Sequence, residues 1–318
     1  CIVGFWGYFI PRMGMDKVKK HWRYLIARWG AYPVVWCLAG EGTMPYYLSK
    51  TPKEDADTQK HGLTELARYV HETDPHHHPV TIHPPSSSRD CVDDASVIDF
   101  DMLQTGHSDR QSVPNTIQTI NRCLSASPRM PVLIGEVCYE GIQEASRQEV
   151  QRFMFWSALL SGTGGHTYGA NGIWQVNTRE KPYGLSPHGH SWGGPPWDVA
   201  AALPGSRQLG LAKALLMRYA WPKLEPHPEL IDPHWNQEDY WRPFAAEIPG
   251  ETIFAFTPAS YTGATFRNLK PGSYRAYFFN PTDGVETEIG VIVPDATGSW
   301  KIAEVPIFQD WVVVLEHK

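Results

Sequence analysis

Apolar runs and amphipathic stretches alternate through the first two thirds of the chain. An amphipathic pattern predicts a helix at residues 15–29, and helical sequence is also found at residues 114–125, 144–160 and 205–219. A polar helix is expected at about residues 52–73. The apolar runs between these helices predict strands at residues 1–9, 34–38, 80–83, 98–104 and 131–136. Residues 162–175 predict a glycine-rich strand together with its exit loop. Several of these runs lack apolar–polar alternation, as expected of parallel strands covered on both faces. Six strand–helix repeats in regular order favour a parallel α/β barrel.

The pattern changes after Trp221-Pro222. From about residue 247 to 317, short apolar runs are separated by turn dipeptides such as Pro249-Gly250 and Pro271-Gly272. No helical periodicity survives there, which predicts a small antiparallel β-sandwich. We therefore expect a barrel domain at residues 1–222, followed by a linker and sandwich domain at residues 223–318.

Two of the expected strands end in the same way, with a Gly-Glu pair. One run leads into Gly40-Glu41 and the other into Gly135-Glu136. In a parallel barrel the active site lies at the carboxyl ends of the strands, so both carboxylates would reach one end. A carboxylate pair of this kind suits cleavage of a glycosidic bond, in which one group acts as an acid and the other stays ionised. Glu41 and Glu136 are therefore the predicted catalytic residues.

Neutral hydrogen-bonding groups and aromatic rings follow the same strand ends. The predicted substrate-binding residues are Trp6, His83, Gln104, His107, Tyr139, His166, Tyr168, Asn171 and Trp174. The chain holds 13 Trp and 14 Tyr, whose rings can stack on sugars or fill a core. Glu140 lies beyond the strand end, so we expect it to orient its neighbours and not to react.

Composition and missing motifs narrow the function further. A net charge of -6 gives no reason to expect nucleic acid or an anionic membrane, and no apolar run is long enough to span a bilayer. Neither a phosphate-binding loop nor a G-x-S-x-G motif occurs. The His76–His78 run, between Pro75 and Pro79, predicts an exposed turn and not a metal site. No metal and no cofactor are expected. Cys37 and Cys138 fall on predicted strands and are interpreted as core residues.

Several motifs occur in an order that resembles one known family. They are WCLAGE, TIHP, DFDMLQTGH, PVLIGEVCYEG and GHTYGANGIWQ, followed by LPGSRQLG and a terminal DWVVVLEHK. This order resembles the apiosidase-like glycoside hydrolases, family 140 and its relatives. That family joins a catalytic (β/α)8 TIM barrel to a small C-terminal sandwich, which is often labelled a collagen-binding domain.

The resemblance implies roles for the two carboxylates. Residues 1–9 would be the third barrel strand, so that the chain holds strands three to eight of an N-terminally truncated barrel. Glu41 would end the fourth strand as acid/base, and Glu136 would end the seventh as nucleophile of a retaining mechanism. The family usually shows Gly-Gly-Asp where this chain has Ala39-Gly40-Glu41, and the longer acid reaches further into the site.

The expected function is hydrolysis of glycosidic bonds in a complex polysaccharide of plant pectic type. The expected partner is an oligo- or polysaccharide substrate, and the resemblance implies a secreted or periplasmic protein. An alternative stays open, in which the chain is a non-catalytic module that binds a glycan or a matrix protein. The sequence leaves the oligomeric state open.

Overall fold

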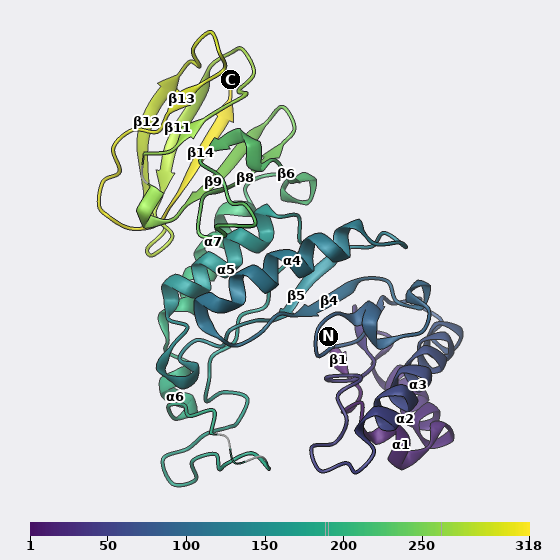
Figure 1. Ribbon diagram of the computed structural model, residues 1–318. Helices are drawn as coiled ribbons and strands as arrows, with labels where there is room; N and C mark the ends of the chain where they lie inside the picture. The colour runs from purple at the N-terminus through teal and green to yellow at the C-terminus, as the bar shows by residue number, and fades with distance from the viewer. Residues whose placement is uncertain (188, 190, 262) are drawn as a thin grey trace. The chain divides into compact units, whose positions relative to one another are not determined.

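A computed structural model describes residues 1–187, 189, 191–261 and 263–318 (Figure 1). The chain forms two compact units. The first comprises Cys1–Thr105, Asn121–Glu136 and Gly184–Ser191, and the second comprises Gly106–Ile120, Val137–Tyr183 and Trp192–Lys318. The predicted domain boundary at residue 222 stays a prediction.

The first unit combines helices with short parallel strands. In chain order it contains β1 (Ile2–Val3), α1 (Phe9–Met13), α2 (Met15–Trp29), β2 (Trp36–Cys37), α3 (Pro52–Thr73), β3 (Val80–Thr81), β4 (Asp101–Gln104) and β5 (Val132–Glu136). Strands β1, β2 and β3 form one parallel sheet in that order, and β4 pairs with β5 in parallel. Helix α4 (Ser112–Ser125) has residues in both units.

Helices α2 and α3 begin and end where the sequence predicts. The buried residues of α2, Val18, Trp22 and Ile26, recur every four positions and so form one face. The Trp22 ring meets Trp36 of β2 edge to face, with the ring centroids 5.9 Å apart. This packing fixes the helix face against the sheet that leads to Glu41.

The second unit contains the antiparallel strands and three helices. Its elements are α5 (Gln148–Leu160), α6 (Trp197–Ala200), α7 (Pro204–Leu216), β6 (Glu225–Pro226), β7 (Ile231–Asp232), β8 (Phe244–Ile248), β9 (Thr252–Thr257), β10 (Thr265–Phe266), β11 (Tyr274–Phe279), β12 (Glu286–Ile292), β13 (Trp300–Lys301) and β14 (Trp311–His317). Six strands form a sheet in the order β12-β11-β14-β9-β8-β6, and three form a second sheet in the order β13-β10-β7 (Figure 1). The chain is thus an α/β protein with a β-rich C-terminal part.

Strand β14 is buried on both faces, because residues from Trp311 to Leu315 are at most 2% exposed. Its alternate residues Trp311, Val313 and Leu315 belong to the core between the two sheets. Arg152 of α5 adds a bidentate ion pair, since its Nε and Nη2 donate to Asp310, just before β14, at 2.7 and 2.6 Å.

Several predicted elements differ from the structure. The strand at residues 1–9 is only Ile2–Val3, because α1 already begins at Phe9. The strand at residues 162–175 is wrong: these residues, all described, hold isolated bridges at His166 and Ala170 and no strand. Gly162 and Gly172 adopt positive φ there, which interrupts extended backbone. Helix α5 begins at Gln148 and not at 144, since Glu144 and Ser146 have positive φ.

The interpretation of Cys37 and Cys138 as core residues is confirmed. Cys37 and Cys138 are buried, at 1% and 0% exposed. Among the described residues, no helix has both the length and the apolar character needed to span a bilayer.

Candidate active site

Four of the predicted site residues meet at strand ends of the first unit. Glu41 follows β2, His83 follows β3, and Gln104 and Glu136 are the last residues of β4 and β5. The Gln104 Nε2 donates to Glu41 Oε1 at 3.3 Å and to Glu136 Oε1 at 3.4 Å. His83 Nε2 lies 2.9 Å from the other oxygen of Glu136, Oε2. One amide therefore joins the two predicted catalytic carboxylates.

A β-bulge at Gly135 aims Glu136 at this amide. The register of β4 and β5 pairs Leu103 with Ile134 but Gln104 with Glu136, which leaves Gly135 as the extra residue. A Cβ on Gly135 would lie 2.3 Å from Cγ of Met102, so only glycine fits there. In the Gly135-Glu136 pair, the glycine therefore allows both the close packing against Met102 and the shift in strand register.

The backbone of Glu41 is in a left-handed conformation with φ of 41°. A non-glycine residue in this region stores strain, and such residues occur often at functional sites. The turn is tied on both sides, because Gly42 N–H donates to His83 O at 2.8 Å and Met44 N–H donates to Glu41 O at 2.8 Å. Trp6, 47% exposed, pairs with Gly40 through a parallel bridge, which places it beside this turn.

The two carboxylates have the exposure that chemistry on a bound molecule requires. Both side chains are half-buried, so a substrate can reach them while part of their surface is held by protein. The side chains of His83 and Glu136 are 19% and 16% exposed. Since both Oε1 atoms hydrogen-bond to the same nitrogen at 3.3 and 3.4 Å, they lie no more than about 6.7 Å apart. Two carboxylates at that spacing can act on opposite sides of one bond.

The other predicted site residues belong to the second unit. His107 stacks on Tyr139 with ring centroids 4.9 Å apart and an interplanar angle of 11°. Trp174 is 45% exposed and meets the ring of Tyr183. These rings offer flat surfaces, and their role in substrate binding stays a prediction.

Asn171 and His166 are more enclosed than the sequence suggests. Asn171 is 0% exposed; its Nδ2 donates to Trp192 O, and its Oδ1 accepts from Gln175, both at 2.8 Å. Both ring nitrogens of His166 are buried and have no hydrogen-bond partner among the described residues, and burial lowers its pKa to about 4. His166 is therefore neutral at pH 7.

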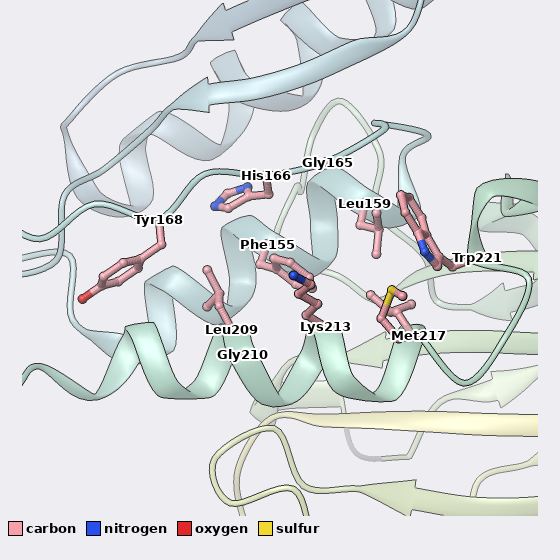
Figure 2. Close-up of a pocket in the computed structure, with 11 residues that line it drawn as sticks. Phe155, Leu159, Gly165, His166, Tyr168, Leu209, Gly210, Lys213, Met217 and Trp221 are labelled. Carbon is pink, nitrogen blue, oxygen red and sulfur yellow. The ribbon is translucent and has the colours of Figure 1, made fainter. Parts of the chain in front are cut away.

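His166 and Tyr168 line a cavity of about 380 Å³ between α5, α7 and the chain from Gly165 to Tyr168 (Figure 2). Its lining is mostly apolar, with Lys213 of α7 as the cationic member. Neither Glu41 nor Glu136 lines it, so this cavity and the carboxylate pair are different features.

The sequence predicts that Glu140 orients its neighbours, but it does not show which residues Glu140 contacts in the second unit. Glu140 accepts from the Tyr168 hydroxyl at 2.5 Å and from the Gly205 N–H at 2.9 Å. Gly205 follows Pro204 at the first turn of α7, and this Pro-Gly pair inside the LPGSRQLG motif was the available signal. No group of three His, Cys, Asp or Glu side chains suited to a metal occurs in the described part of the chain.

Two solved structures share the fold of this chain. One is described as a glycoside hydrolase, and it aligns with a TM-score of 0.78 and 21% identity over 99% of this chain and 72% of its own. The other is a glycoside hydrolase family 5 protein from Bacteroides vulgatus ATCC 8482, with a TM-score of 0.76 and 21% identity over 99% and 69% of the two chains. No curated protein sequence matches significantly.

A match to a family model, together with this shared fold, identifies the protein as a glycoside hydrolase. The family model described as "Apiosidase-like, catalytic domain" matches residues 3–223. The chain belongs to this apiosidase-like family.

Proposed function

We propose that this glycoside hydrolase uses Glu136 as nucleophile and Glu41 as acid/base in a retaining mechanism. The observation that carries the proposal is the Gln104 amide, which hydrogen-bonds to both carboxylates. The resulting limit of about 6.7 Å between the two oxygens includes the spacing of retaining enzymes, about 5–5.5 Å. Most of the inverting range of about 6.5–9.5 Å lies above this limit, which supports the retaining proposal.

Glu136 is held for attack by its two neighbours. Gln104 contacts one of its oxygens and His83 the other, so the carboxylate has one orientation. In the first step a Glu136 oxygen bonds to the anomeric carbon as the glycosidic bond breaks, and Glu41 gives its proton to the leaving oxygen. In the second step Glu41 takes a proton from water, whose oxygen displaces Glu136. Both carboxyl groups thus return to their starting states.

We further propose that strands β1 to β5 are strands of a (β/α)8 barrel. The alternation of parallel strands with α2, α3 and α4 supports this, as does the similarity to the two solved glycoside hydrolases. Substrate-binding roles are proposed for Trp6, His83 and Gln104 beside the carboxylates, and for His107, Tyr139, His166, Tyr168, Asn171 and Trp174 from their places in the sequence.

The proposed substrate is a plant polysaccharide of pectic type, acted on by a secreted or periplasmic enzyme. Membership of the apiosidase-like family supports this class. The aromatic Trp6 and the neutral donors His83 and Gln104 suit sugar hydroxyls and ring faces.

The full-length protein should release sugars from at least one member of a panel of pectic and other plant polysaccharides. Glu136→Gln should lower kcat about 10³-fold or more while leaving the melting temperature unchanged. The matched control is Glu72→Gln, an exposed glutamate on α3, which should keep the wild-type rate. NMR of the first-formed product should show the anomeric configuration of the substrate. Wild-type turnover by Glu136→Gln would refute the assignment.

A further inference from the structure

Glu140 is a buried residue that hydrogen-bonds to the segment from Tyr168 to Asn171 and to the start of α7 at Gly205. Glu140 is only 1% exposed, and its Oε2 accepts hydrogen bonds from both the Tyr168 hydroxyl and the Gly205 N–H. Its backbone also pairs with the chain beyond Tyr168: Glu140 N–H donates to Gly169 O, and Asn171 N–H donates to Glu140 O, both at 2.9 Å. Side chain and backbone of Glu140 therefore fix the same segment at both ends.

Gly205 is required for this junction. A Cβ at that position would lie 2.4 Å from Glu140 Oε2 and 3.0 Å from the Tyr168 ring. The α7 backbone can approach the carboxylate only because the side chain is missing. Figure 2 shows the Tyr168 hydroxyl directed away from the cavity that its ring lines. The Tyr168 hydroxyl thus donates to Glu140, while its ring lines the cavity.

The segment that Glu140 fixes continues as a closed hydrogen-bonded loop. Gln175 donates through its Nε2 to Asn171 Oδ1 and accepts from the Gly172 N–H at 2.6 Å. Between these anchors stand Ile173 and Trp174, which are 43% and 45% exposed. Trp174 is thus an exposed aromatic side chain on a loop that buried hydrogen bonds hold in place, as expected of a residue that contacts a ligand.

We infer that Glu140 is a positioning residue, whose contacts to Tyr168 and Gly205 hold the segment from Tyr168 to Trp174 in the conformation that binds a sugar of the substrate. The inference rests on the proposed function, because it uses the substrate-binding role of this segment. Burial raises the pKa of Glu140, while its donors Tyr168 and Gly205 act in the opposite direction. Those two contacts are therefore what favours the carboxylate form in this enclosed place.

Three variants break the junction from its three sides: Tyr168→Phe removes the hydroxyl donor, Gly205→Ala displaces the carboxylate, and Glu140→Gln removes the charge. Gly210→Ala is the matched control, since it lies in the same helix and its Cβ would meet nothing within 4 Å. We expect each junction variant to raise KM about tenfold, the effect of one hydrogen bond to a charged group, and to leave kcat within about twofold. Gly210→Ala should leave both parameters unchanged.

Hydrogen exchange of the Asn171 amide gives a readout that needs no substrate. It should speed up in the three junction variants and stay at the wild-type rate in Gly210→Ala. Glu140→Gln keeps one acceptor oxygen, so it should retain a lower KM than Glu140→Ala. Assays well below the melting temperature of each variant separate positioning from loss of folded protein.

The outcomes are distinguishable. Faster exchange with an unchanged KM would make the junction structural only and overturn the positioning role, while the proposed function would stand. A wild-type protein that cleaves no glycan in the panel would overturn the proposed function and the positioning role together. A raised KM in all three variants with an unchanged control supports the inference.

Discussion

Glu136 and Glu140 stand four positions apart, and their surroundings are opposite. Glu136 is half-buried, its contacts include the side chains of His83 and Gln104, and part of it stays exposed. Glu140 is 1% exposed and is held by the Tyr168 hydroxyl and the Gly205 backbone. A carboxylate that reacts must meet a substrate, whereas one that holds a fold can be sealed. Exposure and donor type therefore separate the two roles where residue type cannot.

Replacing each glutamate with alanine should change the free energy of unfolding by different amounts. Glu140→Ala leaves the Tyr168 hydroxyl and the Gly205 N–H buried without their acceptor, so the free energy of unfolding should fall by about 3 kcal/mol. Glu136→Ala removes a group that is still reached by solvent, and should change the free energy of unfolding by less than about 1 kcal/mol. Urea unfolding of both variants measures the difference. Equal losses would contradict the distinction.

A third carboxylate, Asp74, can be compared with Glu140 through the pKa values of the two groups. Asp74 is 2% exposed, and burial alone would raise its pKa. The Trp36 indole N–H, the backbone N–H groups of His78 and His76, and the His78 ring instead hold the pKa at about 2. More donors reach Asp74 than Glu140, so the pKa values of the two buried acids shift in opposite directions.

The signs of the two pH dependences follow. Asp74, with its lowered pKa, stabilises the fold above the usual aspartate range, and this stabilisation disappears as pH falls towards 2. Glu140, with its raised pKa, favours the fold most at low pH and less as pH rises. Asp74→Asn should lower the free energy of unfolding at pH 7 by about 2 kcal/mol and flatten its fall between about pH 4 and 2. Unfolding curves across pH test this; an unchanged slope would refute it.

The smallest expected effect concerns the Gln104 amide between the two proposed catalytic carboxylates. Gln104→Met keeps the length of the side chain but removes the donor to Glu41 and Glu136. We expect kcat/KM to fall about tenfold, since both carboxylates keep their other contacts. Steady-state kinetics measure it, with circular dichroism as the check on folding. A wild-type value would show that the amide does not orient the pair.

The sequence predicts local structure well where one segment carries its own signal. The bounds of α2 and α3 follow from their apolar faces, from Gly30 after one helix and from Pro52 at the start of the other. The meeting of Glu41, His83, Gln104 and Glu136 follows from the rule that parallel strands end together.

Contacts between segments that are far apart in the sequence could not be predicted from it. The bulge at Gly135 depends on the Met102 side chain of the neighbouring strand. Arg152 and Asp310 pair across 158 positions. The expected strand at residues 162–175 failed because its apolar and aromatic residues resemble a strand, while Gly162 and Gly172 turn the backbone to positive φ.

The left-handed backbone at Glu41 has a practical consequence. Asparagine and glycine adopt φ near 41° more readily than glutamate, so Glu41→Asn or Glu41→Gly should relieve part of the strain. The same change removes the proposed proton donor. Loss of activity at this position should therefore come with a gain in thermal tolerance, a stability–activity trade-off confined to one residue. Such a variant would be a thermally robust, inactive form, suited to capturing an uncleaved glycan in a crystal.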